Sequence, residues 1–139
     1  MNVRPVAVAA AGLLGALATA CTAGTPRSDA DLALGATVRV EAEGCSMRPV
    51  VGSGSFVADQ LVLTVAHVVA GAIDVDVILP DGTEKQTTVV GIDRRKDLAV
   101  LRVDAATKPL AIGTMNPRSE GSFVTWRTGI ATVLPFSAT

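Results

Sequence analysis

Short apolar runs separated by turn residues constrain the fold of this chain most strongly. Residues 36–43 alternate apolar and polar side chains, as in a strand with one buried face. Residues 73–79 alternate in the same way, which predicts that Ile73, Val75 and Val77 face the core. Runs of this length at this spacing are typical of an all-β fold, a small barrel or sandwich. Further strands are expected at residues 50–58, 61–66, 84–92, 97–103, 121–127 and 130–136.

The composition agrees with an all-β fold and excludes some partners. The 139 residues include 13 glycines and 7 prolines, which favours strands joined by turns over long helices. The 12 Lys and Arg residues nearly balance the 13 Asp and Glu residues, giving a net charge of -1. With this charge the chain has no excess of basic residues that would bind nucleic acid or an anionic membrane surface. Nucleic acid is therefore not an expected partner.

Residues 1–20 are predicted to be a secretory signal peptide and not part of the fold. Arg4 is the only charged residue there, and a continuous run of small apolar residues occupies positions 6–20. This run is shorter than the roughly 20 residues that a membrane span needs. The protein is therefore expected to be exported, either to the bacterial cell envelope or into the medium.

Two cleavage schemes fit the end of this segment. Residues 18–20 (Ala-Thr-Ala) suit an ordinary signal peptidase, and the same residues followed by Cys21 resemble a bacterial lipobox, although lipoboxes favour Leu at the position of Ala18. In the second scheme Cys21 is lipidated and anchors the protein to a membrane, and residues 21–35 form a tether. Cys45 then has no partner in this chain. Because an exported protein can form disulfides, its partner would lie in a segment that is missing here.

His67, the only histidine, lies at a boundary between two elements. It follows the apolar run at 61–66 and precedes Gly71, which would close one helical turn. A lone histidine in such a place is usually structural, but Asp97 begins a later strand and could meet it at the rim of one sheet. A carboxylate there orients an imidazole and stabilises its protonated form. The basic loop at 94–96 is expected to be a solvated hairpin tip.

Three segments occur in the order Gly52-Ser-Gly-Ser-Phe-Val57, Thr64-Val-Ala-His67 and Asp97-Leu-Ala-Val-Leu101. Together they resemble the first half of a trypsin-like serine protease, most closely the bacterial exported, HtrA-like members. The resemblance implies peptide-bond hydrolysis on polypeptide substrates, without a cofactor or a metal. It makes His67 the general base and Asp97 the acid that orients it.

The resemblance covers about residues 38–103 and implies a chymotrypsin-like double barrel. Residues 36–113 would form the first six-stranded antiparallel barrel, and residues 114–139 would begin a second barrel that is largely missing. Cys45 could then pair with a cysteine of that missing barrel. The specificity pocket would also lie there, so the sequence predicts neither the substrate preference nor the oligomeric state.

The expected nucleophile is absent from the sequence. In this family it lies in a Gly-Asp-Ser-Gly-Gly segment, and the 139 residues contain no such segment. Ser53 and Ser55 match the family's structural strand. The chain is therefore expected to be truncated before its nucleophile and inactive alone. Two alternatives stay open: a non-catalytic envelope lipoprotein, in which a half-barrel binds a partner chain, or a truncated reading frame without a function.

Overall fold

The computed structural model describes residues 28–44, 48–114, 120–127 and 130–137. The predicted signal peptide, Cys21 and Cys45 lie outside these residues. Two short helices, α1 (Asp29–Ala36) and α2 (Ala66–Val69), accompany the strands. The described part holds no helix of sufficient length and apolar character to cross a bilayer. The strands are β1 (Thr37–Glu43), β2 (Val50–Ala58), β3 (Leu61–Thr64), β4 (Asp74–Ile78), β5 (Glu84–Asp93), β6 (Leu98–Val103), β7 (Glu120–Arg127) and β8 (Ile130–Ser137).

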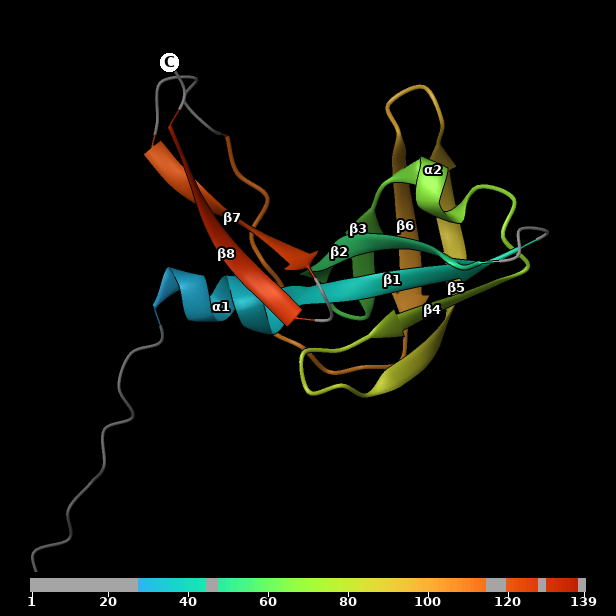
Figure 1. Ribbon diagram of the computed structural model, residues 1–139, viewed down its shortest axis with the longest axis horizontal. Coiled ribbons are helices and arrows are strands. Elements are labelled where there is room, and N and C mark those ends of the chain that lie inside the picture. Colours follow the sequence, from blue (N-terminus) through green and yellow to red (C-terminus); the bar gives the residue numbers. More distant parts are fainter. Residues whose placement is uncertain (1–27, 45–47, 115–119, 128–129, 138–139) are drawn as a thin grey trace, which may run out of the picture.

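Six strands close into an antiparallel barrel in the order β1-β2-β3-β6-β5-β4 (Figure 1). The pairing of β1 with β4 closes it, and Val40 lies opposite Val77 in that register. Closure leaves no strand edge unpaired within the barrel. The predicted all-β fold with a six-stranded antiparallel barrel is confirmed.

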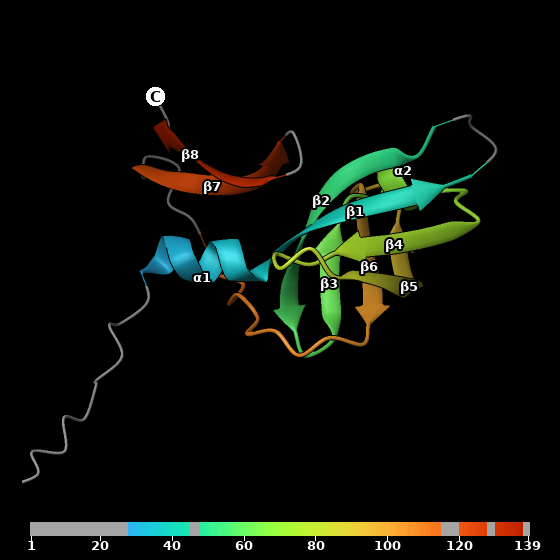
Figure 2. The same cartoon turned by 60° about the horizontal axis from the view of Figure 1, so that its bottom comes forward.

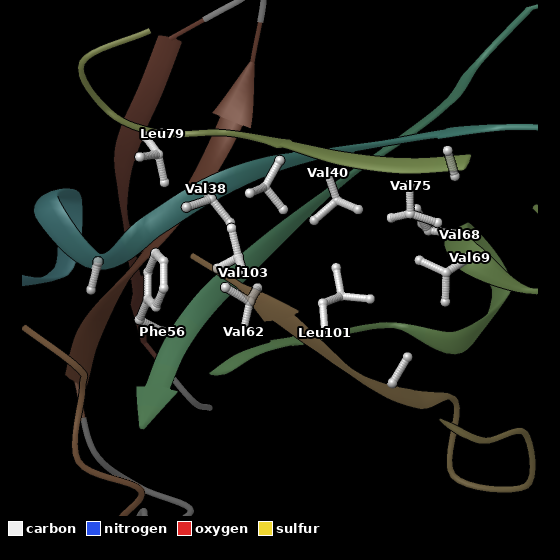
Figure 3. Packing of buried hydrophobic residues seen from close by; sticks show 14 residues of the cluster. Val38, Val40, Phe56, Val62, Val68, Val69, Val75, Leu79, Leu101 and Val103 are labelled. Carbon is white, nitrogen blue, oxygen red and sulfur yellow. The ribbon is translucent and has the colours of Figure 1, made fainter. Parts of the chain in front are cut away.

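Side chains from every barrel strand except β5 fill the interior (Figure 3). Phe56, Leu101 and Val62 have no more than a trace of exposed surface. Burying one such side chain contributes about 1.5–3 kcal/mol. The alternating face of β1 supplies Val38 and Val40, as the sequence pattern predicts.

Close packing of neighbouring elements requires glycine at both ends of the Gly52-Ser-Gly54 segment in β2. A Cβ at Gly54 would lie 2.6 Å from Cγ1 of Val62 on the next strand. A Cβ at Gly52 would lie 2.7 Å from Cγ2 of Val68 on α2. Real Cβ atoms essentially never approach so closely. The two glycines therefore let β3 and α2 pack directly against the β2 backbone.

The strands β7 and β8 form a separate two-stranded sheet beside α1 and outside the barrel (Figures 1 and 2). Ser53 of β2 connects this hairpin to the barrel. Its Oγ accepts the backbone N–H of Trp126 at 3.0 Å and lies 3.1 Å from Oγ1 of Thr125. The sequence prediction of two strands near residues 121–136 is confirmed.

Helix α1 occupies much of the range 21–35, where the sequence suggested a tether. Its start is a capping box: Ser28 Oγ accepts the Asp31 N–H, and the Asp31 carboxylate accepts the Ser28 N–H. The helix leads directly into β1 and contacts both β7 and β8. Local capping therefore orders a stretch whose composition looks like a linker.

Candidate active site

The single turn of α2 holds His67 at the rim of the barrel. Strand β3 ends at Thr64, and the backbone turns through Ala66–Val69 before Gly71, whose φ of +83° ends the turn. Val68 and Val69 are buried and fix the turn to the core. The His67 side chain belongs to α2 and is 68% exposed to solvent. The predicted helical turn after the third strand is confirmed.

Asp97 reaches the same place from the turn between β5 and β6 (Figure 1). Its φ is +55°, a left-handed conformation that Asp tolerates better than most residues. Its carbonyl oxygen accepts the Ala66 N–H at 3.2 Å. The turn is braced by Asp93, whose Oδ1 accepts the backbone N–H groups of Arg95 and Lys96. Asp97 is thus held beside the first residue of α2.

Both carboxylate oxygens of Asp97 bind His67. Oδ2 lies 2.7 Å from the imidazole Nδ1, and Oδ1 accepts the His67 backbone N–H at 2.9 Å. The residue before α2, Val65, supplies no side-chain cap, so Asp97 takes that role from the turn between β5 and β6. The hydrogen bond from the imidazole, followed by the one from the His67 backbone, lowers the pKa of Asp97 below its ordinary value. Asp97 is therefore an ionised carboxylate at neutral pH.

This geometry selects one form of the imidazole. An ionised carboxylate can only accept hydrogen bonds, so Nδ1 of His67 carries the proton that points at Asp97. In the neutral ring Nε2 then holds the lone pair and can accept a proton. Both side chains are substantially exposed, at 68% for His67 and 48% for Asp97. A base with its lone pair open to solvent is accessible to a reacting group.

Two shallow hollows border His67. One, of about 220 Å³, is lined by Ala66, Ala70, Arg94, Asp97 and His67 itself. The other, of about 190 Å³, is lined by small and apolar residues that include Val50 and Val68. The Arg94 contribution was missed in the sequence, although its position three residues before Asp97 was a usable signal.

Two of the described serines, Ser28 and Ser53, have other contacts. Ser28 caps α1, and Ser53 holds β7, as set out above. In the part of the chain that the structure describes, no hydrogen bond joins a serine to His67. Ser46 and Ser119 lie outside the described residues. The two predicted residues, His67 and Asp97, are brought together, and a nucleophile beside them is not seen among the described residues.

Comparison with known sequences shows similarity to proteases. The family model described as "Trypsin-like peptidase domain" matches residues 52–131. The "probable periplasmic serine endoprotease DegP-like" of Halomonas elongata is 41% identical over 75 residues, which are 52% of this chain and 16% of that protein. "Protease Do-like 1, chloroplastic" of Arabidopsis thaliana is 46% identical over 68 residues, which are 45% of this chain and 16% of that protein. The chain thus spans about one sixth of these relatives.

Solved structures agree with the sequence matches. The active form of the Rv3671c protease from M. tuberculosis superposes with a TM-score of 0.67 at 25% identity, covering 76% of this chain and 48% of that one. An HtrA-type protease with a tripeptide gives a TM-score of 0.63 at 28% identity, covering 76% of this chain and 36% of that one. The barrel with its His67-bearing turn therefore has the fold of one part of such proteins.

Proposed function

This chain belongs to the trypsin-like peptidase family, and from that premise we propose that it supplies the base and the orienting acid of a serine endopeptidase. The 2.7 Å contact between His67 Nδ1 and Asp97 Oδ2 carries the proposal. It leaves Nε2 as the nitrogen that accepts a proton. A relative named as a serine endoprotease supports the reaction class, and so does the family model, whose match over residues 52–131 includes both residues.

In the proposed mechanism His67 acts twice. Nε2 takes the proton of a serine hydroxyl as that oxygen attacks the peptide carbonyl, and then gives a proton to the leaving amine. Asp97 holds the ring through both of its oxygens and stabilises the imidazolium that forms between these steps. The backbone hydrogen bond from His67 to Asp97 keeps the carboxylate in place while the ring changes charge.

The serine is not proposed from within these 139 residues. They contain no Gly-Asp-Ser-Gly-Gly segment, and the hydroxyl of Ser53 accepts a backbone N–H of β7. We therefore propose that the chain alone does not hydrolyse peptides and that the nucleophile comes from additional sequence. Covalent labelling of the purified 139-residue chain by a fluorophosphonate would contradict this part of the proposal.

The catalytic roles are tested in a protein that includes the nucleophile. If the DNA after the Thr139 codon encodes a Gly-Asp-Ser-Gly-Gly segment, the joined protein is expected to hydrolyse casein. His67→Ala should then abolish activity, and Asp97→Asn should lower kcat by on the order of 10⁴-fold, because the wrong imidazole tautomer is held. Full activity in His67→Ala would refute the assigned base. A surface variant such as Lys108→Gln serves as the control.

Export and lipid attachment at Cys21 complete the proposal. The apolar run at 6–20, the lipobox-like residues before Cys21 and the periplasmic description of the Halomonas relative support them. Cells expressing the chain are grown with labelled palmitate. Cys21→Ser should abolish incorporation, and the matched Cys45→Ser should not. Equal labelling of the two variants would contradict lipid attachment at Cys21 and favour a secreted protein without a lipid anchor.

A second candidate is a non-catalytic envelope protein that binds a partner chain. The β7–β8 hairpin favours it, because Phe123 and Ile130 are 48% and 64% exposed on a two-stranded sheet. This candidate predicts a stoichiometric complex that survives His67→Ala and is lost in Phe123→Ser. A complex that needs His67, or none at all, would count against it.

A further inference from the structure

The turn between β5 and β6 contributes more than a solvated hairpin tip. Its residue Arg94 lines the hollow of about 220 Å³ next to His67, together with Ala66, Ala70 and Asp97. Figure 1 shows this turn standing beside α2. The neighbouring cations Arg95 and Lys96 are not part of that lining. One of three consecutive basic residues therefore lines the hollow beside the imidazole.

The two carboxylates that flank the basic residues in the sequence already accept hydrogen bonds. Asp93 accepts the backbone N–H groups of Arg95 and Lys96. Asp97 accepts the ring and backbone N–H groups of His67. Among the described residues no ion pair joins Arg94 to an Asp or Glu. Its guanidinium is thus a fork of donors without a carboxylate acceptor in the part of the chain that the structure describes.

The second hollow that borders His67 has a different lining. Its lining includes Ala42, Val50, Val68 and Ala72, and the imidazole is its only polar side chain. Arg94 therefore makes the first hollow the cationic one of the two that border His67. A guanidinium recognises a carboxylate through charge-assisted hydrogen bonds, and among the described residues no Lys or Arg lines the second hollow.

We propose that Arg94 selects polypeptides with an acidic side chain close to the bond that His67 acts upon, by binding that carboxylate in the hollow it lines. The inference rests on the proposed peptidase function and names its substrate class. An exposed guanidinium also attracts such substrates over distances of about a Debye length, so the preference weakens with salt.

The test uses the full 139-residue chain and needs no catalysis, so it can fail or succeed independently of the peptidase activity. Because His67 is the only histidine, its ring gives a single set of NMR signals that reports binding beside it. The probes are acetyl-Ala-Glu-Ala-amide and its isosteric partner acetyl-Ala-Gln-Ala-amide. The variants are Arg94→Gln and the matched control Arg95→Gln, both in an exposed turn.

The chain is expected to bind the Glu peptide roughly two- to fivefold more tightly than the Gln peptide at low salt, as judged by saturating shifts of the His67 ring. Arg94→Gln should remove this ratio, and Arg95→Gln should keep it. Equal affinities for the two peptides would overturn the proposal. So would a preference that survives Arg94→Gln, one that falls equally in Arg95→Gln, or Glu-dependent shifts that spare His67.

Discussion

Replacing Gly52 by alanine tests whether β2 and α2 fit together as closely as the structure indicates. The new Cβ would lie 2.7 Å from Cγ2 and 3.3 Å from Cγ1 of Val68, whereas ordinary contacts begin at 3.4 Å. The shorter contact must therefore lengthen by about 0.7 Å. Rotation of Val68 gives little relief, because both of its methyl groups are close and a β-branched side chain in a helix has one preferred rotamer. Helix α2 has to move away from the barrel.

This movement should cost stability and disturb the candidate active site. Overpacking a buried site costs about 1–3 kcal/mol. The entropy that alanine removes from the unfolded chain offsets only about 0.4–1 kcal/mol of that. His67 precedes Val68 on α2, so its hydrogen bond to Asp97 should lengthen as well. We expect a lower free energy of unfolding together with shifted His67 ring signals.

Urea denaturation and NMR of the purified chain measure both effects. The matched control is Gly35→Ala, since a Cβ at Gly35 meets nothing within 4 Å. Gly35 lies inside α1, where alanine is the better helix former, so that variant should be as stable as the parent or up to about 1 kcal/mol more stable. A Gly52→Ala chain with parental stability and unchanged His67 signals would refute the close packing of α2 on β2.

Three further predictions follow from the contacts of Asp97, Ser53 and Phe56. The lowered pKa of Asp97 means that its carboxylate stabilises the folded chain above the ordinary carboxyl pKa, and that this contribution disappears as the pH falls through the folded-state pKa. The stability gap between the parent and Asp97→Asn should therefore be present at about pH 7 and shrink as the pH falls below the ordinary carboxyl pKa; a gap that stays constant would contradict this. Ser53→Ala removes the acceptor for a β7 backbone N–H, so amide exchange should speed up in β7 and not in the barrel, and uniform protection would count against the connection. Phe56→Ala should cost about 3–5 kcal/mol in urea unfolding because the side chain is fully buried, whereas Phe123→Ala, half exposed, should cost much less; equal losses would place the core elsewhere.

Much of the fold could be predicted from the sequence because period-two alternation reports which face of a strand is buried. The alternation around Val38 and Val40 predicted the inner face of β1 correctly. The same rule was wrong for Ile73, which is 75% exposed. Strand β4 begins one residue later, and the Ile73 N–H bonds to the Glu43 carbonyl as the chain enters the sheet. Alternation cannot locate the residue at which a strand begins.

The pairing of His67 with Asp97 was predictable in outline, because both residues lie at the ends of strands that the topology brings together. The detail was not. The second hydrogen bond, from the His67 backbone, depends on the left-handed conformation of Asp97, which no local pattern encodes. The place of Arg94 beside the ring likewise depends on the path of the turn that Asp93 braces. Long-range geometry of this kind requires the assembled barrel.

The tautomer of His67 is the most direct test of the central claim, that Asp97 holds the ring as a ready base. The ¹⁵N chemical shifts of the single imidazole report which nitrogen carries the proton in the neutral ring. We predict that Nδ1 carries the proton and that Nε2 holds a free lone pair. The preference for this tautomer should be lost in Asp97→Asn. A neutral ring protonated mainly at Nε2, unaffected by Asp97→Asn, would contradict the account.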